Sequence, residues 1–150
     1  MVAHVGRDVL VDFAIADEDA NPDLLTFINL GMMRGKSIKT SWDTADTTAD
    51  DSPDFTKTSL VTFKNVEFSG DGVSYDDAVY NQEALEAHVV SPGSATANQP
   101  KVWFRLTYPS GKKYTGPFIV SEWSNDSPYA DAATWSITAS SNGNVVLTPA

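Results

Sequence analysis

The stretch Lys101–Trp123, KVWFRLTYPSGKKYTGPFIVSEW, contains two segments of alternating apolar and polar residues on either side of a turn. The residues Pro109 to Lys112 supply turn chemistry, so the stretch predicts a β-hairpin. Pro117 lacks an N–H group for a strand ladder, which predicts a sheet edge or a bulge at that position. The apolar positions of the first segment are Val102, Phe104, Leu106 and Tyr108.

Other segments on both sides of this hairpin have the pattern of strands. Ala133–Ala139 alternates cleanly, and a turn at Ser141–Asn144 leads to a closing strand at Val145–Leu147. Nearer the N-terminus, three further stretches predict strands through alternation or through β-branched and aromatic residues. They are Val9–Ile15, Arg34–Trp42 and Ser59–Phe68. The chain is therefore predicted to be mainly β.

One helix is expected between these strands. Ser74 followed by Asp77 resembles a capping box after the turn at Gly70–Gly72, and the helix is predicted to run for about four turns and end at Ser91. A short apolar turn or helix is also expected at Leu24–Leu30. The residues at helical spacing that predict a face packed on the sheet are Tyr75, Ala78, Val79, Leu85 and Val89.

A long connection, residues 43–57, lies between two of the predicted strands. Its acids occur without any cation between Thr40 and Lys57, so we expect a solvated loop. A connection of this length in a compact domain is usually functional or disordered. The aromatic and acidic residues of interest in and beside it are Trp42, Asp43, Asp46, Asp50, Asp51, Asp54 and Phe55.

Size and composition limit the classes of protein. The 150 residues suit a single domain, 1–150, and the absence of cysteine excludes disulfides and zinc–thiolate sites. The net charge of −10 disfavours sequence-specific nucleic-acid binding. The chain has neither an apolar run of membrane-spanning length nor the pattern of a signal peptide, so we expect synthesis in the cytoplasm and no membrane partner.

Catalytic residues are sparse. His4 and His88 are the available imidazole bases, and neither lies in a nucleophile elbow. His88 is expected to be a structural residue at a helix end. We therefore expect no enzyme, catalytic residue, metal or cofactor. Carboxylate pairs of the glycosidase type can arise by chance among twenty acids, and the candidates are Glu67, Glu83, Glu86 and Glu122.

Two loops have partial ligand-binding patterns. The Asp17–Asp23 segment has the alternate oxygens of a calcium loop, but Pro22 replaces the glycine and Ile28 stands where a bidentate acid is needed. Whether it binds a cation stays open. The Gly31–Ser37 segment lacks the glycine spacing of a phosphate loop.

Four tryptophans, Trp42, Trp103, Trp123 and Trp135, allow two interpretations. Exposed indoles could form a carbohydrate platform, whereas buried or interface indoles would be structural. The first interpretation defines an alternative function, a monomeric carbohydrate-binding β-sandwich.

The order of parts resembles the major tail tube proteins of long, non-contractile-tailed bacteriophages. The resemblance rests on the segment Arg34–Thr48, the Asp71–Gly72 turn before the acidic helix, and the hairpin with its Tyr108–Gly111 turn. It implies a β-sandwich or partial barrel with one flanking α-helix. It further implies hexameric rings that stack into the hollow tail of a virion, through which phage DNA is ejected. The chain is expected to lack the C-terminal immunoglobulin-like extension of some relatives.

The resemblance also implies partners and sites. The expected partners are other copies of the chain, the tape measure protein, and tail terminator or tip proteins, with phage DNA passing non-specifically. Residues 43–57 would contact an adjacent subunit or ring. An acidic channel would repel phosphates, and Glu67, Asp71 and Glu122 are its candidate residues because they lie in or beside strands. A third possibility, a small secreted hydrolase, would need a convergent acid pair.

Overall fold

The computed structural model describes residues 3, 5–49, 54 and 56–149. The predicted mainly β fold with one α-helix is confirmed. Short 3-10 helices occupy Gly6–Asp8, Pro22–Leu24, Ala78–Tyr80 and Ser94–Thr96. The strands and the α-helix are β1 (Leu10–Ala14), β2 (Ile28–Asn29), β3 (Met33–Asp46), β4 (Ser59–Val73), α1 (Gln82–Val90), β5 (Lys101–Thr107), β6 (Lys113–Asp126), β7 (Thr134–Ser141) and β8 (Val146–Thr148).

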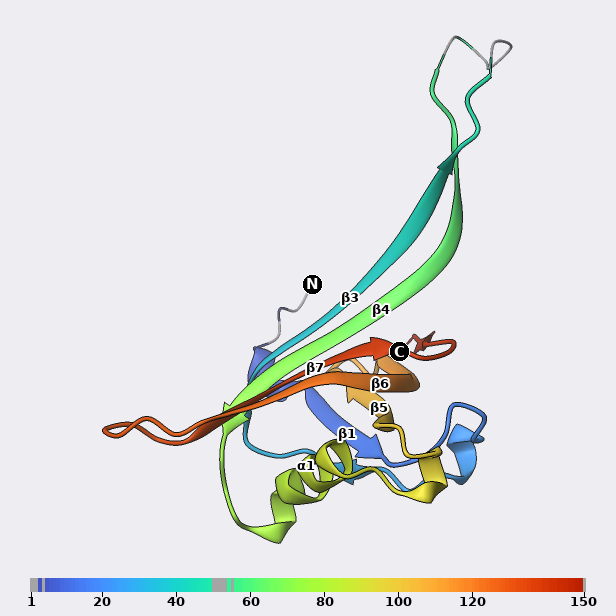
Figure 1. The fold of residues 1–150 in the computed structure, drawn as a ribbon. Coiled ribbons are helices and arrows are strands. Elements are labelled where there is room, and N and C mark those ends of the chain that lie inside the picture. Colours follow the sequence, from blue (N-terminus) through green and yellow to red (C-terminus); the bar gives the residue numbers. More distant parts are fainter. Residues whose placement is uncertain (1–2, 4, 50–53, 55, 150) are drawn as a thin grey trace.

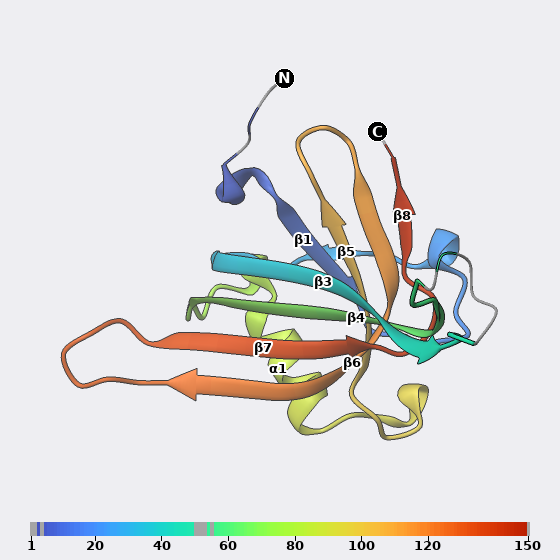
Figure 2. The same cartoon turned by 90° about the horizontal axis from the view of Figure 1, so that it is seen from above.

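All eight strands belong to one antiparallel sheet, in the order β2-β1-β5-β6-β7-β4-β3 with β8 also paired to β6. The long strand β6 connects its two halves. Residues Lys113–Ile119 pair with β5, whereas Phe118–Asp126 pair with β7. The sheet folds over at β6, and the strands of its two halves cross in Figure 2. We call β3, β4, β7 and the second half of β6 the four-strand layer, and the remaining strands the β1–β5 layer.

The hydrophobic core lies between these two layers. Phe68 of β4 and Phe104 of β5 are fully buried, and their ring centroids are 4.9 Å apart although their strands are not neighbours in the sheet. Phe118 of β6 continues the cluster at 5.6 Å from Phe104. The expected sandwich or partial barrel is thus built from one folded sheet, because β6 is shared by both layers.

The β3–β4 hairpin projects far beyond the body of the molecule (Figure 1). β4 pairs with β7 only from Glu67 to Val73, so its first half has β3 as its sole strand partner. The β3–β4 ladder continues to the pair Asp46–Ser59. Asp43–Asp46 therefore lie in a strand, and the expected loop 43–57 begins later than predicted. Acids are tolerated there because a two-stranded ribbon leaves both faces in water.

The predicted helix start is wrong. Asp77 Oδ1 accepts a hydrogen bond of 3.1 Å from the Val79 N–H and caps the short 3-10 helix instead. Asn81 then adopts a left-handed conformation with φ of 57°, which separates that turn from α1. The residues predicted to form one buried helix face therefore differ in exposure. Tyr75 and Val79 are exposed, whereas Leu85 is fully buried. Figure 1 shows α1 on the side of the sheet away from the projecting hairpin.

A buried glutamine connects α1 to the strands. Gln82 Nε2 donates to the carbonyl oxygens of Gly31 at 2.9 Å and Val73 at 3.0 Å, and its Oε1 accepts from the Tyr75 N–H at 2.9 Å. This side chain satisfies three backbone groups at once, which the apolar periodicity could not reveal.

Two smaller predictions are modified. The segment Leu24–Leu30 ends a 3-10 helix and then forms β2 rather than a single helix. Pro117 lies inside β6, where β8 ends at Thr115 and β7 begins at Phe118. Its carbonyl accepts from Asn142 N–H at 2.9 Å across this gap. Pro117, which has no N–H group, therefore lies at the gap between the end of β8 and the start of β7.

Candidate assembly surfaces

The four-strand layer has one apolar and one polar face. Val66 and Phe68 are buried in the core, whereas Glu67 between them is exposed on the opposite side. Strand register places Ser140 beside Glu67, and Thr138 beside Glu122. The candidate acids Glu67, Asp71 and Glu122 consequently share one surface, which we call the polar face. The polar face comprises Ser37, Lys39, Ser41, Asn65, Glu67, Ser69, Asp71, Glu122, Ser124, Asp126, Thr134, Ser136, Thr138 and Ser140.

Hydroxyls outnumber charges on the polar face, and acids outnumber bases. Four of its members are carboxylates and Lys39 is its one cation. Arg34 lies beside this face, with Nη2 at 3.8 Å from Asp71 Oδ2. Asp71 Oδ1 also accepts from the Gly35 N–H at 3.0 Å. Such a surface has little attraction for phosphates, since cations are what retain them.

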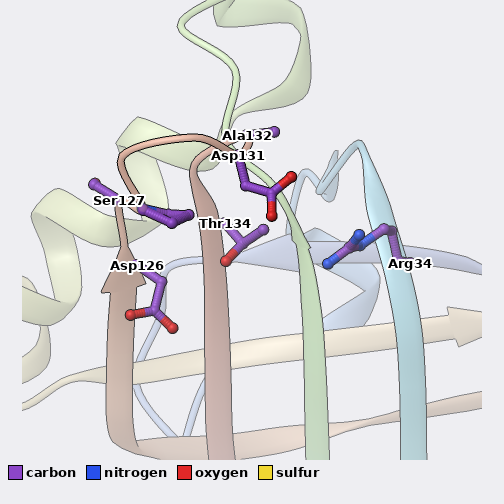
Figure 3. Close-up of a pocket in the computed structure, with 7 residues that line it drawn as sticks. Arg34, Asp126, Ser127, Asp131, Ala132 and Thr134 are labelled. Atoms are coloured by element: carbon purple, nitrogen blue, oxygen red, sulfur yellow. The ribbon is translucent and has the colours of Figure 1, made fainter.

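A shallow polar depression of about 560 Å³ lies at the end of this layer, by the β6–β7 turn. Arg34 of β3 and Asp131 of the turn point into it from opposite sides (Figure 3). Its lining contains no histidine. The lining residues are Arg34, Asp126, Ser127, Pro128, Asp131, Ala132 and Thr134.

Both borders of the four-strand layer are unpaired edges within the described residues. β3 ends the strand order, and β6 has a neighbour on only one side beyond Ile119, where β5 stops. Two parts of these edges are covered. The Val120 N–H at the start of the free part of β6 donates to the Pro100 carbonyl at 3.0 Å, and the start of β3 is covered by the N-terminal segment. There Lys36 Nζ donates to the carbonyls of Gly6 at 3.1 Å and Val9 at 2.6 Å, and burial lowers the pKa of Lys36. Long unpaired edges invite pairing with another chain.

The projecting part of the hairpin, from Trp42 across to Lys64, is here called the arm. At its base Lys64 Nζ ties the arm to the body, donating to Asn144 Oδ1 at 2.9 Å and to the Val145 carbonyl at 3.2 Å. Beyond that point apolar side chains are exposed, with Phe63 reaching 75%. A cluster of this kind on an unsupported ribbon marks an interaction surface. The exposed apolar residues of the arm are Trp42, Leu60, Val61 and Phe63.

The structure describes only some of the residues that were predicted to contact an adjacent subunit or ring. Trp42, Asp43 and Asp46 lie in β3 on the arm, and Asp54 is exposed near its tip. Sequence reasoning missed Leu60, Val61 and Phe63, because β-branched and aromatic residues in a strand usually pack against a core. The other predicted residues, Asp50, Asp51 and Phe55, lie outside the described residues.

The Asp17–Asp23 loop is held by a lysine. Lys101 Nζ lies 3.0 Å from Asp17 Oδ1 and 2.8 Å from Glu18 Oε2. Hydrogen bonds from Glu18 and Lys101 hold the pKa of Asp17 below its usual value. The part of the chain that the structure describes contains no cluster of three or more metal-ligating side chains.

The tryptophans do not form an exposed platform. Trp103 and Trp135 are buried, and Trp103 Nε1 donates to the Asp17 carbonyl at 2.8 Å. Trp123 stacks on Trp135 with centroids 5.1 Å apart and ring planes 5° apart. Trp42, half-exposed on the arm, is distant in sequence and strand from this pair. These positions favour the structural interpretation of the indoles.

The candidate catalytic residues are divided between α1, which carries Glu83, Glu86 and His88, and the polar face. His88 is buried, and its Nε2 lies 2.9 Å from the Lys101 carbonyl, which fits the expected structural role. Glu86 on α1 accepts from Asn125 Nδ2 at 2.8 Å. Glu67 and Glu122 belong to the polar face, and His4 lies outside the described residues.

In the part of the chain that the structure describes, no helix combines the length and the apolar composition that a membrane span requires.

Comparisons with known structures identify the class of fold. The chain aligns with a subunit in the tail of an empty gene transfer agent particle, refined with C6 symmetry, at 19% identity and a TM-score of 0.71. This alignment covers 97% of this chain and 99% of the other. The SPP1 tail tube aligns at 12% identity and a TM-score of 0.65, covering 97% and 79% of the two chains. The fold is therefore that of tail tube subunits.

The same fold occurs in a sheath/tube terminator of an extracellular contractile injection system, at 11% identity and a TM-score of 0.60. That alignment covers 99% of this chain and 98% of the other. No curated protein sequence matches this chain. The family model for phage tail tube proteins matches residues 3–147. This chain belongs to the phage tail tube protein family, so it is a structural protein of the virion tail.

Proposed function

We propose that copies of this chain close into hexameric rings, which stack into the hollow tube that conducts DNA into the host. The observation that carries the proposal is the four-strand layer with an unpaired edge on each side and one polar face. A head-to-tail interface that closes forms a ring. Six copies are proposed because the similar gene transfer agent tail has C6 symmetry.

The direction of the strands fits such closure. The layer contains an even number of antiparallel strands, so β3 of one copy would run antiparallel to β6 of the next. The junction would repeat the geometry already present inside each layer. Strand addition of this kind satisfies the exposed backbone groups of both edges.

In the closed ring the polar face would line the channel. The core already covers the other face of the layer, so the polar face is the surface available to the lumen. Its acids and hydroxyls would let DNA slide without retention. Glu67, Asp71 and Glu122 are thus proposed as lumen residues. No catalytic or cofactor role is proposed, since the site acts by shape and charge alone.

Stacking of rings is proposed to use the arm and its terminal loop. Exposed Trp42, Leu60, Val61 and Phe63 would be buried against an adjacent subunit or ring. Residues 1–150 would act as one tube domain. The tape measure protein inside the tube, and terminator or tip proteins at its ends, are the further partners we propose.

The test is negative-stain electron microscopy of the purified chain combined with light scattering. We expect hollow tubes of uniform diameter and a very large particle mass. A strict monomer whose tryptophan fluorescence responds to glycans would instead support the carbohydrate-binding alternative. The burial of Trp103 and Trp135 disfavours that alternative.

A further inference from the structure

Two opposite charges stand at the two free edges of the polar face. Lys39 lies on β3, and Glu122 lies on the unpaired second half of β6. Glu122 is exposed, and neither side chain has an ion pair within the described residues. A second copy of this chain offers a partner for each charge, because its β6 edge carries Glu122 and its β3 edge carries Lys39.

We propose that Lys39 of one copy pairs with Glu122 of the next across the β3–β6 junction, and that this pair fixes the register of ring closure. The inference rests on the proposed ring. To the proposed ring, the inference adds the register of the two joining strands and the two residues that determine this register.

The ladders inside one chain make the two residues compatible. Lys39 is the register partner of Glu67, and Glu122 that of Thr138, so both point to the polar face. The two strands are separated by β4 and β7. Three strand spacings of about 4.8 Å separate the two strands by roughly 14 Å, and Lys39 and Glu122 of the same chain also lie on different rows of the sheet, so they are too far apart to pair.

Charge selects one register among the alternatives. In an antiparallel junction, a two-residue slip keeps the faces but changes the partners. A four-residue slip would place Lys39 opposite Asp126, but its favourable charge pair would be offset because Asp43 would then lie opposite Glu122, and like charges directly opposite are destabilising. Lys39 opposite Ser124 forms no direct pair. Lys39 opposite Glu122 also places serines 37 and 124 together.

In the selected register Lys39 lies between two carboxylates, Glu67 of its own chain and Glu122 of the neighbour. Charges then alternate along the row that crosses the junction. This arrangement gives the one cation of the polar face a role, namely joining subunits, while the remaining acids keep the channel negative. Complementary charges across an interface fix register and suppress wrong pairings.

A charge-swap experiment tests the pair. We expect Lys39→Glu and Glu122→Lys each to raise the critical concentration for tube assembly roughly tenfold, because both place like charges opposite one another. The double variant should return to within about twofold of the original value. Exposed residues outside the junction supply the matched controls, Lys113→Glu and Glu83→Lys, which should assemble normally. Single variants that assemble normally, or a double variant as defective as the singles, would overturn the pairing.

A disulfide experiment measures the register directly. The chain has no cysteine, so Lys39→Cys with Glu122→Cys introduces the only thiols. Only copies in contact can join them, since a disulfide needs Cα atoms within about 7 Å. Mild oxidation of tubes should give covalent oligomers up to six chains, whereas Lys39→Cys with Asp126→Cys should give few.

The disulfide results separate the two hypotheses. Tubes without the 39–122 link would overturn the pairing and leave the tube function standing. Absence of tubes from the unaltered chain would overturn the proposed function, and this inference with it.

Discussion

Glu67 lies in the middle of the polar face, between β3 and β7, where it makes no hydrogen bond or ion pair within the described residues. It is exposed although its neighbours Val66 and Phe68 are buried. Glu67 is one strand away from the free edge of β3, beside Lys39, and two strands away from the free edge of β6. It does not itself lie on an edge strand, so a change of its charge should disturb the junction less than a change at Glu122.

The first prediction concerns the charge of this residue. Glu67→Lys should give tubes that eject DNA more slowly at low salt, because each ring would carry a band of cations that binds phosphates. The measurement is the ejection rate of assembled particles across ionic strength. The control is Glu83→Lys, which makes the same charge change on α1. An ejection rate equal to that of the control at every salt concentration would contradict a lumen position for Glu67.

Part of the candidate site could be predicted at the level of residues. Alternation within the predicted strand Ser59–Phe68 separates Glu67 from Val66 and Phe68, because side chains repeat every two residues. Asp71 was expected in a turn, and only the structure extends β4 to Val73 and places Asp71 on the same face. The addition of Glu122 depends on the β6–β7 ladder, which no local pattern encodes. The role of Lys39 needs two copies of the sheet and was not predictable.

Among the elements, the arm projects farthest from the body (Figure 1). Beyond Lys64, β3 and β4 pair only with each other among the described strands, and Phe63 is 75% exposed. Two-stranded ribbons are marginally stable alone. We therefore expect the arm to become fixed when a neighbouring subunit covers it.

The second prediction removes part of the segment that connects β3 to β4. Deleting Thr47–Ser52 should leave the subunit folded, because the core lies between the layers and not in the arm. Stacking should be abolished. Circular dichroism and thermal melting would verify folding, and electron microscopy would measure tube length. Tubes of ordinary length from the deletion would rule out a stacking role for this segment.

The third prediction concerns α1. Leu85 is fully buried in the core, so Leu85→Ala should lower the free energy of unfolding by about 2–4 kcal/mol. Val90 is 70% exposed on the same helix, and Val90→Ala should change it by less than about 0.5 kcal/mol. Urea denaturation of both variants measures the difference. Equal midpoints would mean that the buried face of α1 has been misassigned.

Strand prediction succeeded where one face packs on the core, as in β1, β5 and β7. It failed for the end of β3, since a ribbon exposed on both faces has no apolar alternation. The helix start was mispredicted because Asp77 and Asn81 shape a separate turn, and a capping pattern cannot distinguish a 3-10 turn from an α-helix.

For the molecule as a whole, ring closure and stacking use different surfaces. The edges of β3 and β6 would join neighbours within a ring, and the arm would join successive rings. The two steps should therefore be separable by substitution.

The fourth prediction uses this separation. Phe63→Ser on the arm should allow rings to close but not to stack, so particles of about six subunits should accumulate. Lys39→Glu should instead leave mostly free subunits. Analytical ultracentrifugation distinguishes these masses. Identical distributions for the two variants would mean that one surface performs both steps.

The sharing of β6 between the two layers has a consequence for synthesis on the ribosome. β3 and β4 emerge well before their inner neighbour β7 and the second free edge on β6, which lie in the last third of the chain. A nascent chain thus exposes one joining edge long before it possesses the other. A growing polypeptide could receive at most one neighbour, so closed rings would form only from chains that have left the ribosome. Ribosome-bound chains truncated after residue 112 should accordingly be absent from tubes when they are mixed with released subunits.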